Sequence, residues 1–266
     1  MHPIIDFDPV IFGVGGFELR WYGLMYVLGF VVGGQLLRRL VKSKFLPIPI
    51  DKVDTYVFYL IIGMFFGARF FYVFIYNWDY YSENLLDLLS VWKGGLSFHG
   101  AVVGLCISTY IFAKKMNLHF YQVADSMAVA GSPGLLFGRI GNFINGELYG
   151  RITDSPVGMI FSDAGPYPRH ASQLHEGILE GIVLFIILYI VHSRQKYYGY
   201  VTSLFIIGYG SFRFMVEFFR EPDAQLGYYL NYFTMGQILC FVMMIISVFV
   251  FFHVRKLKIV NPIYRL

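Results

Sequence analysis

The residues best suited to chemistry gather in one block, 138–151, with the sequence GRIGNFINGELYGR. Arg139 and Asn142 are three residues apart, so a helix that continues through them places both on one face. A guanidinium offers a planar fork for a phosphate, and an amide adds a neutral donor. The pair would clamp an anion; alternatively, Arg139 only extends toward water from a helix end while the asparagines cap a turn. The block also supplies supporting candidates: Asn145, Glu147 and Gly150.

A second block, 208–223, carries Arg213 and Glu217 about one helical turn apart. Residues four apart face the same side of a helix, so the carboxylate can orient the guanidinium and offset part of its desolvation. The guanidinium would keep further donors for a ligand, and Arg220 follows three residues later. The alternative is a purely structural ion pair inside the membrane.

A third block, 94–104 (GGLSFHGAVVG), places His99 just inside an apolar run. Histidine is the side chain suited to moving a proton near neutral pH, so His99 is a candidate general base. The alternative is a histidine that only ties helices together through hydrogen bonds.

Two other chemistries find little support. Ser97 and Ser108 invite a serine protease, but no Gly-x-Ser-x-Gly elbow is present. His170 and His175 are five residues apart with no matching Cys or Asp cluster, so we expect no metal site.

A strongly apolar chain must position these few charges. Of its 266 residues, 57% are apolar and 14% are charged, against about 25% charge in a soluble domain. The mean hydropathy is +0.58. Such a composition excludes a disordered chain, a nucleic-acid-binding module and a disulfide-rich secreted domain. It indicates an all-α polytopic membrane protein, in which Cys106 and Cys240, both within apolar runs, are expected to be buried and inert.

Seven apolar stretches approach the length of about 20 residues that a membrane helix needs. They cover 19–37, 53–76, 96–113, 123–141, 176–192, 200–218 and 232–253. The third, fourth and fifth are short or weakly apolar. The sequence therefore predicts about seven transmembrane helices in a single integral membrane domain spanning 1–266.

The positive charges predict how this domain is oriented. Thirteen of the 21 Lys and Arg residues flank the first, third and fifth loops or lie in the C-terminal tail, and Lys93 is among the five on the other side. Cytoplasmic segments carry the excess of positive charge, so the N-terminus is expected outside and the C-terminus, with Arg265, in the cytoplasm. Segment 142–175, between the fourth and fifth spans, then becomes a small extracytoplasmic head.

Charges inside membrane spans are costly and mark function by default. The three blocks would line a lateral cavity open to the outer leaflet, which suits an anionic lipid headgroup whose tails stay in the bilayer. A transporter of an anionic lipid or solute is the rival, but the polar residues concentrate on one predicted side. A purely structural membrane subunit would gain nothing from charges at such positions. From the residues alone, the protein is a membrane enzyme or transporter that acts on an anionic lipid.

The same blocks resemble a known enzyme family. The chain is similar nearly end to end to the prolipoprotein diacylglyceryl transferases. The similarity rests on DPVIFGVGGFELRWYGLMY (8–26), the blocks 94–104 and 138–151, PRHASQLHE (168–176) and GYGSFRFMVEFFREPDAQ (208–225). The chain departs from the frequent family pattern at Ala101, at Tyr149 and at His175. These changes bear on packing more than on chemistry.

The resemblance implies a transferase of the bacterial cytoplasmic (inner) membrane, with its active site toward the outer leaflet. Its reaction moves the diacylglyceryl group of phosphatidylglycerol to the thiol of the lipobox cysteine in a prolipoprotein. A thioether forms and glycerol phosphate leaves, as the first step of lipoprotein maturation. The implied partners are phosphatidylglycerol, the prolipoprotein signal peptide and membrane lipids, with no nucleic acid. Neither a cofactor nor a metal is needed.

The resemblance also suggests roles for individual residues. Arg139 and Arg213 would grip the phosphate and stabilise the leaving group, and Asn142 and Tyr22 would help to bind the headgroup. His99 would be the general base for the thiol or would position the base.

The supporting residues complete the expected site. Glu217 would orient Arg213, and Glu147 would order the polar head and pair with an arginine. Asn145 and Gly150 belong to the same supporting set.

Overall fold

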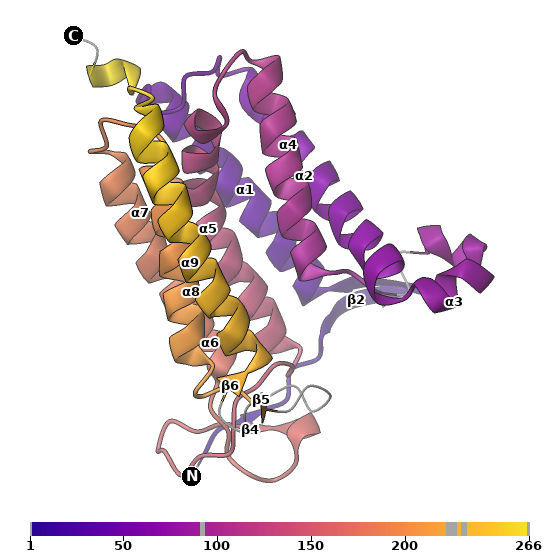
Figure 1. Cartoon of the computed structure of the whole chain (residues 1–266). Coiled ribbons are helices and arrows are strands. Elements are labelled where there is room, and N and C mark those ends of the chain that lie inside the picture. Colours follow the sequence, from indigo (N-terminus) through magenta and orange to yellow (C-terminus); the bar gives the residue numbers. More distant parts are fainter. Residues whose placement is uncertain (1, 91–93, 222–227, 230–232, 265–266) are drawn as a thin grey trace. The chain divides into compact units, whose positions relative to one another are not determined.

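The computed structural model describes residues 2–90, 94–221, 228–229 and 233–264. Two compact units are described separately: unit 1 comprises Met1–Arg39 and Asp125–Leu266, and unit 2 comprises Leu40–Ala124 (Figure 1). Lys93, Arg265, segment 222–225 and Tyr232, which entered the sequence analysis, lie outside the described residues.

Each predicted span coincides with helical structure. The helices are α1 (Trp21–Lys42), α2 (Lys52–Phe71) with its π-helical extension η1 (Tyr72–Tyr76), α4 (Phe98–Lys115), α5 (Phe120–Ile144), the continuous run of α6 (Ser172–Glu176), η5 (Gly177–Val183) and α7 (Leu184–His192), α8 (Tyr200–Val216) and α9 (Met235–Leu257).

Four helical stretches in the described part of the chain are long and apolar enough to cross a membrane. They are Trp21–Lys42, Lys52–Tyr76, Ser172–His192 and Met235–Leu257. The shorter α8, with 17 residues, is also apolar. The coarser prediction of a helical membrane protein is therefore confirmed, whereas the number seven and the orientation stay predictions.

In unit 1, small residues bring α1 and α5 into close contact. A Cβ atom at Gly29 would lie 3.3 Å from the Cα of Gly134, and one at Gly33 would lie 3.0 Å from the carbonyl oxygen of Ala130. Without a hydrophobic driving force in lipid, membrane helices associate through such close packing of small residues. This packing fixes the helix that carries Arg139.

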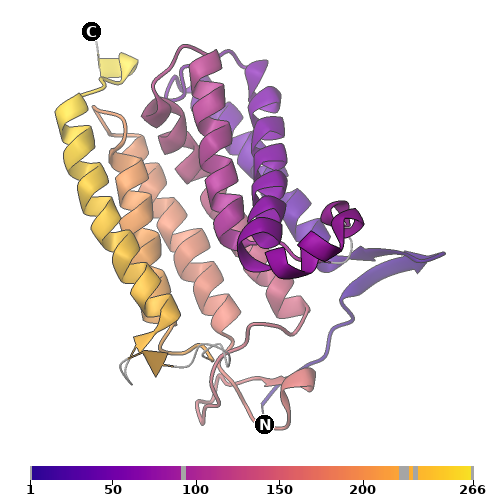
Figure 2. The same cartoon turned by 45° about the vertical axis from the view of Figure 1, so that its right-hand side comes forward.

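Helices α8 and α9 run side by side in both views (Figures 1 and 2). Ser203 on α8 and Ser247 on α9 exchange hydrogen bonds: each hydroxyl donates to the other residue's carbonyl oxygen, at 3.0 and 2.8 Å. Buried hydroxyls in membrane helices find partners on a neighbouring helix in this way. The pair sets the register of α8, which carries Arg213, against α9.

The start of α8 is fixed by a carboxylate from α5. Asp125, fully buried, accepts hydrogen bonds from the backbone N–H groups of Gly199 (2.6 Å) and Thr202 (2.8 Å). It also accepts from the Thr202 hydroxyl (2.6 Å) and the Gln195 amide (3.0 Å). The first N–H groups of a helix have no partner within the helix, and an anion there is favourable. Asp125 thus caps α8 from another helix.

The structure also contains short β-strands, which the all-α prediction did not include. β2 (Val10–Val14) and β3 (Phe17–Arg20) form an antiparallel hairpin whose tip, Gly15–Gly16, has φ of +57° and +86°. Two consecutive residues with positive φ are what a tight hairpin turn requires. β5 (Tyr228–Tyr229) pairs antiparallel with β6 (Phe233–Thr234) just before α9.

The segment predicted as the head begins later than expected and is tied down at several points. Helix α5 continues to Ile144, three residues past the predicted end of its span. Beyond it, β4 (Ile160–Phe161) pairs in parallel with β1 (Ile4–Ile5), so the N-terminus is anchored to this segment (Figure 1). Arg151 N donates to the carbonyl of Phe219 at 2.9 Å, which joins the segment to the end of α8.

In unit 2, α2 packs closely against α4, and the short helices α3 (Trp78–Glu83) and η2 (Leu85–Leu89) follow. Arg69, whose depth the sequence left open, is 9% exposed. Its guanidinium donates to the carbonyl oxygens of Asp87, Leu88, Gly94 and Gly95 at 2.7–3.1 Å. Arg69 therefore organises the loop after η1.

The prediction for the two cysteines is half right. Cys240 is buried as expected, but Cys106 is exposed on α4. An apolar membrane helix can turn one face to lipid, so apolar neighbours in the sequence do not guarantee burial.

Candidate active site

One buried carboxylate lies among three arginines in unit 1. Glu176, whose side chain is 1% exposed, lies 2.5 Å from Nη2 of Arg139. Its other oxygen lies 3.6 Å from Nη1 of Arg220 and 3.9 Å from Nη1 of Arg213. Burying a carboxylate is tolerable only with such partners. Glu176 therefore brings together arginines from α5, α8 and the segment that follows α8.

A second carboxylate lies behind the first. Glu180, fully buried, follows Glu176 by four residues on the π-helical stretch η5 and lies 3.9 Å from Nη2 of Arg139. Single π-helical stretches within α-helices recur at functional sites. Here the stretch places two glutamates within reach of one guanidinium.

The pair predicted from the second block is present. Arg213 Nη1 lies 2.5 Å from Oε2 of Glu217, the residue that caps α8. The other oxygen of Glu217 accepts a hydrogen bond from the Thr234 hydroxyl at 2.8 Å. Thr234 also begins α9, where it forms a capping box with Gln237. Thr234, at the N-terminus of α9, thus positions the Glu217 carboxylate, which in turn positions Arg213.

Arg139 and Asn142 lie on the same face of α5, as the sequence predicted. Arg139 Nη1 donates to Oδ1 of Asn142 at 3.4 Å. The Asn142 amide donates to Oε1 of Glu147 at 2.8 Å, and the Asn145 amide donates to the same oxygen at 3.4 Å. Glu147 contacts the two amides, where the sequence suggested an arginine. Glu147 thereby orients the Asn142 side chain so that its amide oxygen faces Arg139.

Tyr22 lies beside this end of α5. A Cβ atom at Gly141 would lie 2.8 Å from Cδ2 of the Tyr22 ring, so the glycine makes room for the ring. The Tyr22 hydroxyl shares a hydrogen bond with the hydroxyl of Tyr26 at 3.2 Å.

The arginine and glutamate side chains around Glu176 form one connected set, here named the Arg–Glu cluster. Its members are Arg139, Glu176, Glu180, Arg213, Glu217 and Arg220. Three arginines face three glutamates. The glutamate side chains are 0–6% exposed and the arginine side chains 13–18%, so the carboxylates lie deeper and the guanidiniums closer to the surface. Glu176 and Glu217 thus offset, from the buried side of the site, the positive charge that the sequence predicts for it.

Gly150 packs against the end of α8, because a Cβ atom at this position would clash with the carbonyl oxygen of Phe219. Its N–H donates to the carbonyl of His170 at 2.7 Å, and a Cβ atom would lie 2.7 Å from Cβ of His170. A side chain at position 150 would clash with Phe219 and His170 and push them away. Partial burial and the neighbouring His175 lower the pKa of His170. Arg151 Nε donates to the carbonyl of Arg220 at 2.8 Å, which anchors the third arginine of the cluster.

His99 belongs to unit 2, not to the unit that holds the cluster. It is the second residue of α4 and is exposed. Its Nδ1 shares a hydrogen bond with the hydroxyl of Tyr76 at 3.2 Å. Its role as general base stays a prediction.

Glu176 and Glu180 are the residues that the sequence analysis missed. Within the predicted spans, the sequence suggested roles for Arg139, Arg213 and Glu217 but none for Glu180, which stands in an apolar run, GILEGIVLF, where a carboxylate is equally costly. An intramembrane acidic residue was therefore an available signal. Within the described residues, no group of three or more His, Cys, Asp or Glu side chains could hold a metal ion.

Comparison with known proteins covers almost the whole chain. The family model described as prolipoprotein diacylglyceryl transferase matches residues 9–253. A Geobacter sulfurreducens protein is 47% identical over 252 residues, which is 95% of this chain and 97% of that protein. A Pasteurella multocida protein is 47% identical over 243 residues, covering 91% and 90% of the two chains.

A third relative, from Francisella tularensis subsp. tularensis, is 43% identical over 260 residues, covering 96% of this chain and 97% of its own length. All three relatives carry the name phosphatidylglycerol–prolipoprotein diacylglyceryl transferase. The resemblance found in the sequence motifs is therefore confirmed.

Proposed function

The chain belongs to the prolipoprotein diacylglyceryl transferase family, and we propose that it transfers the diacylglyceryl group of phosphatidylglycerol to the lipobox cysteine of a prolipoprotein. The sulfur attacks the carbon of the diacylglyceryl group that bears the phosphate, and the C–O bond between that carbon and the phosphate breaks. The products are a thioether and glycerol phosphate, and the thiol proton passes to a base. This is the first step of bacterial lipoprotein maturation.

The proposal rests on one observation: guanidiniums from two helices lie against one buried carboxylate, Glu176. The phosphate of the lipid carries one negative charge and gains a second as the C–O bond breaks. Preorganised donors stabilise such developing charge most effectively in a site with little water. Arg139 and Arg213 would bind the phosphate oxygens with the N–H groups that face outward.

The neighbouring groups would position the headgroup. The Asn142 side chain, fixed by Glu147, and the Tyr22 hydroxyl would contact the glycerol phosphate. Glu217 would hold Arg213 in place from behind.

The thiol is activated by loss of its proton, since the thiolate is the nucleophile. His99 is the proposed base. Asn145 and Gly150 would support the site by ordering Glu147 and the head segment.

We also propose seven membrane spans in one domain, 1–266, in the bacterial cytoplasmic (inner) membrane. The N-terminus and segment 142–175 would lie outside, the C-terminus in the cytoplasm, and the active site toward the outer leaflet. In unit 1, the two chain ends lie at opposite ends of the helices, which fits an odd number of spans (Figure 1). The excess of positive charge in the predicted cytoplasmic loops supports the same orientation.

Mass spectrometry tests the proposal directly. Purified protein is incubated with phosphatidylglycerol and a lipobox peptide, and transfer adds the mass of diacylglyceryl to the peptide cysteine. Arg213→Ala is expected to abolish most of this activity, whereas Arg194→Ala, at an exposed arginine, is the control that keeps it. No mass gain with the native protein, together with lipid movement across liposomes, would support the transporter instead. Full activity of Arg213→Ala would refute the phosphate clamp.

A further inference from the structure

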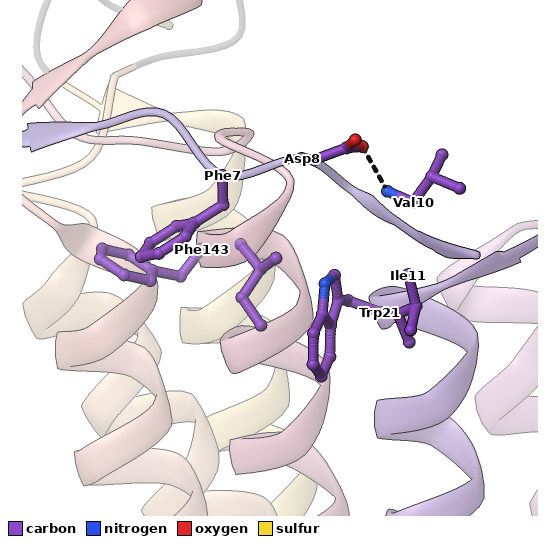
Figure 3. A pocket seen from close by; sticks show the side chains of 7 residues that line it. Phe7, Asp8, Val10, Ile11, Trp21 and Phe143 are labelled. Carbon is purple, nitrogen blue, oxygen red and sulfur yellow. Dashed lines mark hydrogen bonds between the residues drawn. The ribbon is translucent and has the colours of Figure 1, made fainter.

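An apolar groove lies beneath the N-terminal segment of unit 1, outside the Arg–Glu cluster. Its cavity of about 530 Å³ is lined by the side chains of Phe7, Val10, Ile11, Trp21 and Phe143, among others (Figure 3). This volume falls within the range of ligand sites in proteins. We call it the N-terminal groove.

The wall of the groove is held in place before any ligand arrives. The backbone N–H of Trp21 donates to the carbonyl of Pro9 at 3.1 Å. The carboxylate of Asp8, the one acidic group of the lining, accepts from the N–H of Val10 at 2.8 Å (Figure 3). The rings of Phe7 and Phe143 contact each other with centroids 6.3 Å apart. A preorganised, apolar groove costs little to bind an apolar segment.

The groove lies at helix ends and borders the proposed active site. Trp21 is the first residue of α1, and Phe143 is the last but one of α5. Asn142, next to Phe143 in the chain, bonds to Arg139 and Glu147. Consecutive Cα atoms are about 3.8 Å apart, so Phe143 in the wall of the groove lies next to Asn142, which belongs to the proposed phosphate site.

This position identifies the occupant. The acyl chains of a bound lipid extend along the membrane helices into the bilayer, away from the helix ends. The second substrate of the proposed reaction approaches differently, because its cysteine must reach the phosphate at the level of the headgroups. An apolar stretch of peptide next to that cysteine would lie where the groove is.

We propose that the N-terminal groove binds the apolar residues that flank the acceptor cysteine of the prolipoprotein. The proposal rests on the proposed function and adds to it the subsite for the second substrate. Phe7 is 56% exposed in the absence of a partner, and an apolar side chain of the peptide would cover it. A charged side chain in the same place of the peptide would be disfavoured, because the groove has no basic partner among its lining residues.

Steady-state kinetics with two matched variants test this subsite. The double variant Phe7→Ala/Ile11→Ala removes apolar side chains from the groove. The control Phe12→Ala/Val14→Ala removes similar side chains from exposed positions of β2 outside it. The groove variant should raise KM for the peptide at least about tenfold, with KM for phosphatidylglycerol unchanged. Equal peptide KM values in the two variants would overturn the proposal.

Photocrosslinking gives a readout that needs no turnover. A peptide with serine in place of its cysteine and a photoreactive leucine beside it is irradiated with the native protein. Crosslinks at residues 7–11 or at Phe143 support the subsite. Crosslinks elsewhere, or crosslinking of the groove by a photoreactive acyl chain of phosphatidylglycerol instead, overturn it. Failure of the proposed function would show separately, as absence of transfer to every peptide.

Discussion

Replacing Gly236 by alanine should damage the site while leaving the fold intact. A Cβ atom at this position would lie 2.6 Å from Oε1 and 2.8 Å from Cδ of Glu217. Comfortable contacts between such atoms are about 3.5 Å or longer, so the carboxylate must move by roughly 1 Å. That movement breaks the contact of Glu217 with Arg213 or with Thr234, at 2.5 and 2.8 Å respectively.

The expected magnitudes differ for stability and for rate. Losing the Thr234 hydrogen bond costs about 1 kcal/mol, and replacing glycine by alanine in a helix returns up to about 1 kcal/mol. The free energy of unfolding should therefore change by no more than about 1 kcal/mol. Because Arg213 follows its carboxylate, a displacement of about 1 Å should lower the turnover rate roughly 100-fold.

The assay is diacylglyceryl transfer to a lipobox peptide, with thermal unfolding measured on the same samples. The control is Gly131→Ala on α5, where a Cβ atom meets nothing within 4 Å. In a Glu217→Ala background, Gly236→Ala should have no further effect, because no carboxylate remains to be displaced. A native rate for Gly236→Ala, or a further 100-fold loss in that background, would refute the steric reasoning.

Asp125→Ala leaves the buried N–H groups at the start of α8 without acceptors and should lower the free energy of unfolding by about 2–6 kcal/mol, measured by chemical denaturation in detergent. Arg69→Ala should make the segment 85–90, which contains η2, sensitive to limited proteolysis, and Arg69→Lys should restore protection only in part, because an ammonium cannot span four carbonyls. His99→Gln should lower the rate of transfer about 10²–10⁴-fold, whereas a native rate would exclude His99 as the base. Glu176→Gln should lower KM for phosphatidylglycerol and kcat together, and a rise in both would contradict the idea that Glu176 competes with the lipid phosphate for the arginines.

The helices could be predicted because a lipid environment makes their signal local. A run of apolar residues between charged loops is visible without knowing any contact, and each of the seven predicted stretches coincides with a helix. The Arg213–Glu217 pair was predictable for the same reason, since helix geometry alone places residues four apart together.

Other parts of the site depend on contacts between distant residues. Arg139 meets Glu176, 37 residues later in the chain, only because α5 packs against η5. Asn142 was expected beside Arg139, but its bond to Glu147 requires the turn after α5. The N-terminal groove is formed by segments more than 120 residues apart, so no local pattern could reveal it.

The balance of charge in the Arg–Glu cluster bears on how the site would catalyse. Were Arg139 and Arg213 unpaired, they would bind the monoanionic lipid tightly, and tight ground-state binding does not speed the chemical step. Glu176 already satisfies much of their charge, so the lipid phosphate must compete with a carboxylate. When the C–O bond breaks, the phosphate gains a second charge, and its attraction to the guanidiniums grows while that of Glu176 stays constant. The buried glutamates would thus direct the arginines toward the leaving group rather than the substrate.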